Sequence, residues 1–447
     1  MAGIAGILKN GKREVVDQML EIISHRGRDG KEILEYPDIT IGIIWSSRYE
    51  SYIKERLLKN IITDGPGFGQ QAFIEIFEDR VLFYRDELGV TPLYFGKTID
   101  GTICFASEVK ALINLTDEIF ELLPGHTISN MIDQKYFELK TKKPEKDHAY
   151  KIASELRNRL ERSIKKRINS DRIGSWLSGG LDSSIIAAIA KPFVKTLYSF
   201  STGMKDAQDI IYARQVAGHI GSVHKEIVVN MKDILKILPE VIYHLESFDA
   251  LLVRSSILNY YAAKVASDYV SEVFSGECSD EFFAGYLYLK TLPVNQLDDE
   301  LIDIANRLHN TALQRVDRCA GAFGITAHVV FADPEIFDYA LGIPANLKLY
   351  KGIEKWILRK AVSDLLPENV LYRTKAKFWE GSGIGTLLSD YASKKISDQD
   401  FAYERTLNNG WVLNTKEELL YYRLFKEHYG NLYNLNWMGR SKINVKA

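Results

Sequence analysis

The hydrophobic pattern divides the chain into two parts with different predicted structures. In residues 1–140, short apolar or alternating runs follow one another and are separated by glycine and proline. One segment in this part, Glu14–Ser24, has apolar residues at helical spacing. The predicted strands are Ile39–Trp45, Ala72–Phe77, Arg80–Tyr84 and Thr102–Ala106. This pattern predicts an α+β domain built on antiparallel sheets.

After a charged linker at residues 141–147 the periodicity changes. Tyr150–Ile164 has apolar residues three and four positions apart, which predicts a helix. Strand and helix patterns then alternate, and this alternation predicts a parallel α/β sheet. The predicted elements are Arg172–Leu177 with Ser183–Ala190, Thr196–Ser201 with Ala207–His219, His224–Val229 with Met231–His244, then helix Val253–Ala266 and strand Tyr269–Phe274. From about residue 290, through Glu417–Tyr429, the pattern is mainly helical.

Length and composition narrow the class of protein. At 447 residues the chain exceeds one ordinary domain, and a formal net charge of −2 makes nucleic acid an unexpected partner. The sequence has neither an apolar run of about 18 residues nor the basic-then-apolar order of a signal peptide, so we expect a cytoplasmic protein without a membrane partner. Cys104, Cys278 and Cys319 are scattered, as is typical of reduced thiols.

The most informative segment is Ser178–Ser184, which reads Ser-Gly-Gly-Leu-Asp-Ser-Ser between a predicted strand and a predicted helix. Its glycines let the backbone approach an anion, and a helix N-terminus favours negative charge. Its hydroxyl groups add donors, and Asp182 can hold Mg²⁺. No lysine follows the glycines, so we interpret the segment as a pyrophosphate cradle for transfer of AMP. The alternative is an ordinary Gly-Ser turn before a capped helix.

A second loop, Ser275–Glu281, directly follows the predicted strand Tyr269–Phe274. Ligands of open α/β sheets bind beyond the carboxyl ends of the strands, where both loops lie. Asp280 then supplies a second carboxylate for Mg²⁺, and Glu277 is free to act on a proton or to orient an amine. The alternative is an acidic first turn of a helix, a position that carboxylates favour.

A third segment, Arg373–Phe378, is basic. Lys375 could reach the phosphates or a developing oxyanion, where a positive charge stabilises the transition state. A solvated basic turn is the commoner explanation for such a run.

Several segments together resemble the asparagine synthetase B family over most of the chain. Besides the two loops and the Lys375 segment, they are Met1–Gly6, His25–Gly30, Arg85–Tyr94, Phe105–Leu112, Leu123–Gly125 and Glu354–Arg359. The resemblance implies a glutamine amidotransferase-like domain of the Ntn-hydrolase type at residues 1–140. It also implies a PP-loop ATP-pyrophosphatase domain at residues 148–447, with a helical C-terminal part. The implied reaction adenylates a carboxylate with ATP and Mg²⁺, and an amine then displaces AMP to form an amide.

The resemblance also implies roles for individual residues. Asp182 and Asp280 would hold Mg²⁺, and Glu277 and Lys375 would be catalytic at the acyl centre. The residues implied to bind ATP and pyrophosphate are Leu177, Ser178, Gly179, Gly180, Asp182, Ser183, Ser184, Thr202, Ser275 and Gly276.

The N-terminal part departs from the family pattern where the glutaminase chemistry would lie. Ala2 stands where the family has its nucleophilic cysteine, and a methyl group cannot attack an amide. The family's Asn-Gly-Glu-Ile-Tyr-Asn segment has no counterpart between Ile61 and Phe68. We therefore expect a degenerate, structural amidotransferase-like domain rather than a working one.

The substrate side departs as well. Leu251–Arg254 reads Leu-Leu-Val-Arg where asparagine synthetases have Thr-Thr-x-Arg. Thr326–Asp333 replaces the family's Glu-x-Arg-x-Pro-Phe-Leu-Asp. Losing polar contacts of this kind changes specificity by orders of magnitude. The alternative is neutral repacking of a helical core.

The leading hypothesis is therefore an ATP-dependent amide-forming ligase that does not use glutamine. Its partners would be a small-molecule carboxylate and either ammonia or a substrate amine, and a homodimer is left open. One alternative is an intramolecular amide cyclase, or a ligase of a non-aspartate carboxylate, similar to β-lactam synthetase and carbapenam synthetase. An alternative of another class is a non-catalytic nucleotide-binding protein on the same fold.

Overall fold

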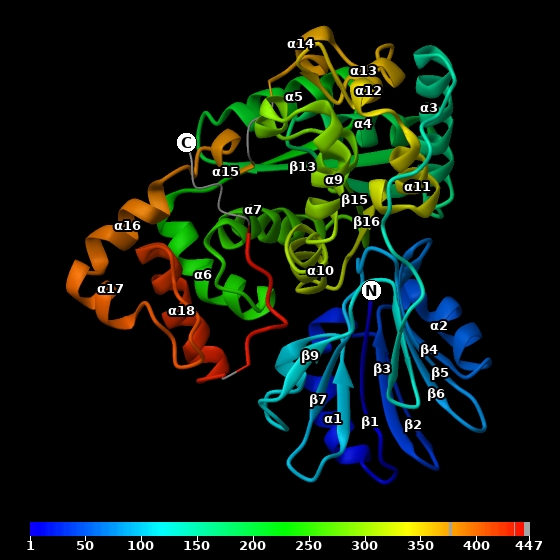
Figure 1. Cartoon of the computed structure of the whole chain (residues 1–447), viewed down its shortest axis with the longest axis vertical. Coiled ribbons are helices and arrows are strands. Elements are labelled where there is room, and N and C mark those ends of the chain that lie inside the picture. Colours follow the sequence, from blue (N-terminus) through cyan, green and yellow to red (C-terminus); the bar gives the residue numbers. More distant parts are fainter. Residues whose placement is uncertain (375–377, 433, 442–447) are drawn as a thin grey trace.

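The computed structural model describes residues 1–374, 378–432 and 434–441. Antiparallel sheets at the N-terminal end, blue and cyan in Figure 1, lie against a larger part built around a parallel sheet. No helix in these described ranges is both long and apolar enough to cross a membrane. Lys375 lies outside the described residues.

Two antiparallel sheets form the N-terminal part. The first has the order β2-β3-β1-β8-β7-β9, and the second has the order β11-β10-β6-β5-β4. The strands of the first are β1 (Ala2–Ile7), β2 (Gly30–Tyr36), β3 (Ile39–Trp45), β7 (Tyr94–Lys97), β8 (Ile103–Ala106) and β9 (Ile119–Glu121). The strands of the second are β4 (Ile61–Gly67), β5 (Gln70–Ile76), β6 (Val81–Arg85), β10 (His126–Ser129) and β11 (Ile132–Lys135).

Strand β3 is buried along its whole length because both of its faces are covered. Ile41 and Ile43 pack in the core between the two sheets. Ile44 packs on the opposite side with Val16 and Leu20 of helix α1 (Arg13–Ile22). The continuous apolar run of β3 is thus the signature of a strand between two apolar layers.

The third sheet has the order β14-β13-β12-β15-β16 and is parallel throughout. Its strands are β12 (Arg172–Trp176), β13 (Thr196–Gly203), β14 (Val223–Val228), β15 (Glu272–Ser275) and β16 (Thr326–Val329). The chain adds β13 and β14 on one side of β12 and then β15 and β16 on the other. The strand order therefore reverses between β12 and β15, which is where doubly wound sheets bind ligands.

Helices surround this sheet. Right-handed crossovers place α4 (Leu181–Ala190) and α5 (Gln208–Ile220) on one face, and α7 (Ala250–Ala266) and α10 (Ala312–Gly321) on the other. The remaining helices are α2 (Glu50–Leu57), α3 (Ala149–Lys165), α6 (Met231–Leu245), α8 (Ser279–Phe283), α9 (Val294–Ala305), α11 (Pro334–Gly342), α12 (Ala345–Lys348), α13 (Trp356–Ala361), α14 (Glu368–Leu371), α15 (Phe378–Gly381), α16 (Leu387–Lys395), α17 (Asp398–Glu404) and α18 (Lys416–Tyr429).

Most predicted strands and helices lie within one to three residues of their observed bounds, and β3 coincides with its prediction. The expectation of helix around Thr326 is wrong, because Thr326–Val329 forms the edge strand β16. This strand is four residues long and is held by parallel pairing to β15. A segment that short has no diagnostic periodicity of its own, so its partner decides its conformation.

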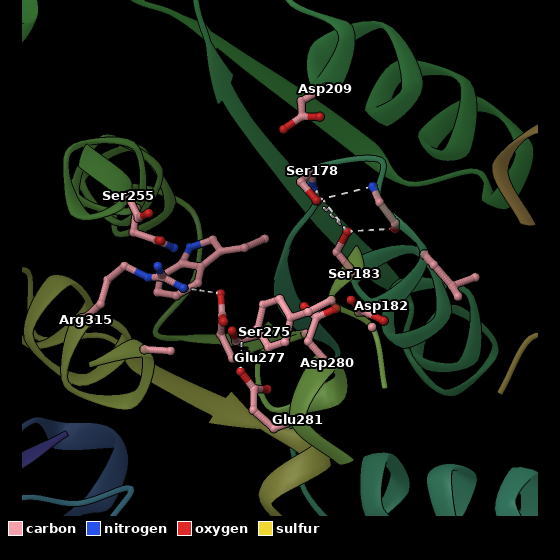
Figure 2. A pocket seen from close by; sticks show the side chains of 18 of the residues that line it. Ser178, Asp182, Ser183, Asp209, Ser255, Ser275, Glu277, Asp280, Glu281 and Arg315 are labelled. Carbon is pink, nitrogen blue, oxygen red and sulfur yellow. Dashed lines mark hydrogen bonds and ion pairs between the residues drawn. The ribbon is translucent and has the colours of Figure 1, made fainter. Parts of the chain in front are cut away.

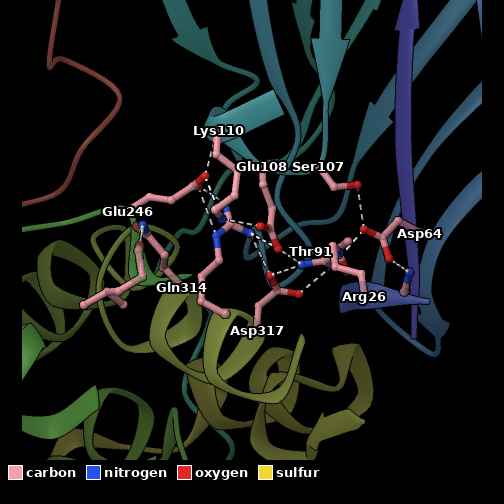
Figure 3. A network of polar contacts seen from close by, with 12 residues as sticks. Arg26, Asp64, Thr91, Ser107, Glu108, Lys110, Glu246, Gln314 and Asp317 are labelled. Carbon is pink, nitrogen blue, oxygen red and sulfur yellow. Dashed lines mark hydrogen bonds and ion pairs between the residues drawn. The ribbon is translucent and has the colours of Figure 1, made fainter. Parts of the chain in front are cut away.

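The two parts of the chain meet at a buried network of charges (Figure 3). The guanidinium of Arg26, fully buried, donates to Asp317 of α10 at 2.8 and 3.0 Å, to Asp64 at 2.9 Å and to Glu108 at 2.9 Å. A second contact reaches the parallel sheet directly, since the hydroxyl of Tyr49 donates to Glu272 of β15 at 2.7 Å. The N-terminal part is thus hydrogen-bonded to helix α10 and to strand β15. Strand β15 is one of the two strands between which the strand order reverses.

Candidate active site

The two loops predicted from the sequence lie side by side at the point where the strand order reverses. One follows β12 and opens α4, and the other follows β15 and opens α8. Gly276 permits their close approach, because a Cβ there would lie 2.8 Å from the backbone nitrogen of Ser183. Gly179 has φ of +69°, a conformation that glycine adopts without strain.

The first loop is held in shape by its own hydroxyl groups. The hydroxyls of Ser178 and Ser183 lie 3.1 Å apart, and that of Ser184 donates to the carbonyl of Gly180 at 2.7 Å. Ser178, Gly180 and Ser183 line a cavity of about 530 Å³, whereas Ser184 and Gly179 are not among its lining residues. Ser184 therefore stabilises the conformation of the loop on the side that faces away from the cavity.

The cavity brings together most of the other residues predicted to bind nucleotide. Leu177 and Thr202 line it beside the first loop, and Ser275 and Gly276 line it beside the second. The hydroxyl oxygen of Thr202 is buried and has no hydrogen-bond partner among the described residues, which leaves it available to a ligand.

Asp182 and Asp280, the two carboxylates expected to hold Mg²⁺, converge on one position. The ammonium of Lys355 occupies that position, 2.6 Å from Asp182 and 2.7 Å from Asp280. Ser279 also donates to Asp182, at 2.8 Å. Mg²⁺ is commonly held by one or two carboxylates together with substrate phosphates, so this donor set fits it. The sequence did not identify Lys355 as a site residue, although Lys355 lies in Glu354–Arg359, one of the segments that resemble the family.

Glu277 is not free, contrary to the expectation from sequence. Arg315 of α10 donates to its carboxylate at 2.5 Å, and both side chains line the cavity (Figure 2). Arg315 is 38 residues away along the chain, and no local pattern connects the two. Only the packing of α10 against α7 and β16, which brings Arg315 to the second loop, reveals this partner.

Glu281, at the end of the second loop, also lines the cavity. Burial and the neighbouring charge of Asp280 raise the pKa of Glu281 to about 7. The hydroxyl of Tyr286 donates to it. Glu281 is thus a carboxyl group whose protonation changes near neutral pH beside the cation position.

Arg373 begins the third predicted segment and lies against the first loop. Its guanidinium pairs with Asp209 at 2.6 Å and donates to the carbonyl of Ser178 at 3.3 Å. The chain therefore passes the phosphate cradle immediately before Lys375, whose own position lies outside the described residues.

The three cysteines of the chain are buried and are not activated nucleophiles. Burial raises the pKa of Cys104 to about 11, that of Cys319 to about 12, and that of Cys278 well above its usual value. Attack by sulfur requires the thiolate, which burial disfavours at all three positions.

A parallel sheet with two loops at its switch point, one rich in glycine and serine and both bearing a carboxylate, defines a nucleotide-dependent synthetase. The family model for asparagine synthase matches residues 155–305 and 294–441, and that for the glutamine amidotransferase domain matches residues 69–173. The chain belongs to the asparagine synthetase family, and it is an ATP-dependent C–N ligase.

Individual relatives agree with this assignment. Asparagine synthetase [glutamine-hydrolyzing] 2 of Lotus japonicus is 35% identical over 407 residues, which are 85% of this chain and 69% of that protein. Asparagine synthetase B [glutamine-hydrolyzing] of Escherichia coli (strain K12) is 32% identical over 394 residues, which are 82% of this chain and 70% of that protein. Among solved structures, NMN synthetase from Francisella tularensis aligns over 67% of this chain and 100% of its own, at 12% identity and a TM-score of 0.31.

Proposed function

We propose that the protein forms an amide from a carboxylate, ATP and an amine or ammonia without hydrolysing glutamine. The observation that carries this proposal is the setting of Ala2. Its side chain is 3% exposed within the core between the N-terminal sheets, and its carbonyl accepts a hydrogen bond from Arg26 at 2.9 Å. The residue at the family's nucleophile position is thus apolar and closed off from solvent.

We further propose that residues 1–140 are a degenerate amidotransferase-like domain and that residues 148–447 form the synthetase domain. The contact network of Arg26 supports a structural role for the first of these, because it ties the N-terminal sheets to α10. A buried cation among three carboxylates favours one arrangement of the two domains.

In the synthetase domain, we assign Asp182 and Asp280 to Mg²⁺, which would neutralise charge on the phosphates of ATP. Ser178, Ser183 and the backbone of the first loop bind the pyrophosphate at the N-terminus of α4. Lys355 lies between the two carboxylates, and its ammonium would be available to a phosphate if these carboxylates held Mg²⁺.

The proposed reaction has two steps, adenylation of the carboxylate and formation of the amide. A carboxylate oxygen of the substrate bonds to the α-phosphorus of ATP, the bond to the β-phosphate oxygen breaks, and pyrophosphate leaves. The amine nitrogen then bonds to the acyl carbon, AMP leaves, and the nitrogen gives up a proton. Glu277 lies where it can orient the amine, with Arg315 fixing its carboxylate. Lys375 stays a candidate stabiliser of the acyl oxyanion.

The test combines two assays on the purified protein. In the first, ATP, Mg²⁺ and a mixture of carboxylic acids are incubated with hydroxylamine, which traps an acyl adenylate as a hydroxamate. We expect hydroxamate and an equal amount of pyrophosphate. In the second, glutamine is supplied and free ammonia is measured, and we expect none. Ammonia release from glutamine would overturn the proposal, and so would pyrophosphate formation that requires glutamine. Amide formation within a single substrate molecule, without added amine, would identify the cyclase alternative.

A further inference from the structure

Beyond Glu277 the cavity continues into a part that we name the acyl end. It is lined by Leu251, Leu252 and Asn259 of α7 and by Ile304, Leu308 and Ala312 at the junction of α9 and α10. Figure 2 shows Ser255 of α7 and Arg315 of α10 at the same end of the pocket as Glu277. Ser255, Arg307 and Thr311 line the cavity from the same segments, so this wall combines an apolar surface with a few polar groups and favours a largely apolar ligand.

The described cations that line the cavity already have carboxylate partners. Every lysine and arginine that lines the cavity, within the part of the chain that the structure describes, lies 3.0 Å or less from a carboxylate oxygen. At the acyl end, Arg315 is held by Glu277 at 2.5 Å. Arg307 is half exposed at the rim and pairs with Asp303 at 3.0 Å. A second carboxylate on the substrate would therefore lose its hydration without gaining a cation that lacks a carboxylate partner.

Arg254 does not supply an unpaired positive charge to the acyl end. It lies three positions after Leu251 and two after Leu252, yet it is not among the residues that line the cavity. Its guanidinium makes a two-pronged ion pair with Glu417 of α18, one contact being 2.7 Å. The hydroxyl of Tyr421 donates to the same carboxylate at 2.7 Å. The positive charge of Arg254 is thus neutralised on another side of α7.

Two buried polar atoms remain unpaired at this end, an acceptor on Asn259 and a donor on the guanidinium of Arg315, whose charge Glu277 offsets. The side-chain oxygen of Asn259 and the Nε of Arg315 are buried, and neither has a hydrogen-bond partner among the described residues. Buried polar atoms normally find a partner, because leaving one unsatisfied is costly. An uncharged polar group on a ligand would satisfy them.

We propose that the acyl donor is a monocarboxylic acid with an apolar alkyl or aryl body, which carries at most uncharged hydrogen-bonding groups and no second carboxylate. This inference rests on the proposed ligase function. The carboxylate that reacts faces Glu277 and the phosphates, and the apolar body packs between α7 and the α9–α10 junction. Leu251 and Leu252 determine this preference, since a hydroxyl at either position would remove part of the apolar wall.

Two measurements test the inference on the intact protein. The first is exchange of pyrophosphate into ATP, driven by 3-phenylpropionate, 4-methylpentanoate, succinate or aspartate. The second is calorimetric binding of the same four acids in the presence of Mg²⁺ and a non-hydrolysable ATP analogue. We expect the two apolar acids to exceed both dicarboxylates at least about tenfold in each measurement. Leu251→Thr should lower the response to 3-phenylpropionate roughly tenfold without changing the affinity for the ATP analogue.

Leu58→Thr is the matched control, because Leu58 is exposed in the N-terminal part, far from the cavity lining. Stronger exchange or binding with aspartate or succinate would overturn the inference and leave the ligase function standing. Binding of the apolar acids without pyrophosphate exchange would support the inference and argue against the ligase function. Absence of binding by either apolar acid would overturn the inference.

Discussion

The guanidinium of Arg26 makes two hydrogen bonds to the carboxylate of Asp317, at 2.8 and 3.0 Å, across the boundary between the N-terminal sheets and α10. Two positions earlier on this helix, Arg315 holds Glu277 in the active-site cavity. Side chains two apart on a helix point to nearly opposite sides. Helix α10 therefore contacts the N-terminal part on one side and the site on the other.

Replacing Arg26 by methionine should destabilise the protein strongly. The change leaves Asp64, Glu108 and Asp317 buried without their shared cation, and breaking such a network costs about 3–5 kcal/mol. The measurement is urea unfolding followed by circular dichroism. Arg80→Met is the control, since Arg80 is exposed, pairs with Asp79 and lies over the ring of Phe77, and its loss should change stability by about 1 kcal/mol or less. Equal effects of the two variants would show that the network does not hold the domains together.

Asp182→Asn and Asp280→Asn should each abolish pyrophosphate release. Each change removes one of the two negative charges that converge on the cation position, and Mg²⁺ binding with ATP depends on them. Calorimetric titration with ATP and Mg²⁺ checks the cause, and Asp206→Asn, at an exposed position, is the control. Wild-type turnover in either site variant would remove that carboxylate from the mechanism.

Lys355→Met should change turnover and the affinity for Mg²⁺ in opposite directions. Turnover should fall about 100-fold or more, as expected when a positive charge that stabilises the transition state is lost. Binding of Mg²⁺ alone should become tighter, because the ammonium that lies between Asp182 and Asp280 is gone. Lys351→Met changes an exposed lysine nearby and should alter neither quantity. Unchanged turnover in Lys355→Met would show that the lysine is only structural.

Ala2→Cys should not restore glutamine hydrolysis. The new thiol would be buried in the core of the N-terminal sheets, where desolvation disfavours the reactive thiolate. The loop from Ile61 to Phe68 also lacks the family's oxyanion and substrate contacts. The readout is ammonia release from glutamine, compared with the unaltered protein. A detectable rate would mean that the domain is one substitution away from activity.

The lowered pKa of His244 predicts that the free energy of unfolding depends on pH. Burial, together with the nearby charges of Lys110 and His25, lowers the pKa of His244 to about 3. The unfolded chain binds this proton at about pH 6.5, so the unfolded state holds more protons between those two values. The contribution of His244 to stability is therefore complete above about pH 6.5 and falls as the pH falls, by at most about 1.4 kcal/mol per pH unit.

The comparison that isolates this effect is between the wild type and His244→Phe, by urea unfolding at about pH 7.5 and about pH 5. Burial raises the pKa of Asp86 and of Glu281 to about 7, and their stabilisation is lost as the pH rises, which has the opposite sign. These contributions are common to both proteins and cancel in the difference. His148→Phe, at an exposed position, is the control. A difference in stability that does not shrink toward low pH would contradict the assignment.

Much of the fold follows from local pattern. The alternation of strands and helices after residue 148 predicts the parallel sheet, and the glycines and serines of Ser178–Ser184 predict a phosphate-binding turn at the end of β12. Strand β16 could not be predicted, because four residues carry no period and its pairing to β15 is a long-range contact.

The sequence by itself determined that the chain is a two-part synthetase, that two carboxylate-bearing loops follow adjacent strands, and that no cysteine stands at the nucleophile position. Each of those features depends only on residues that are close together in the sequence. Only the tertiary structure decided that Lys355 lies between Asp182 and Asp280, that Arg315 holds Glu277, and that Arg254 is committed to Glu417. Each of these contacts joins residues that are far apart along the chain, and only packing of the helices around the sheet brings them within reach.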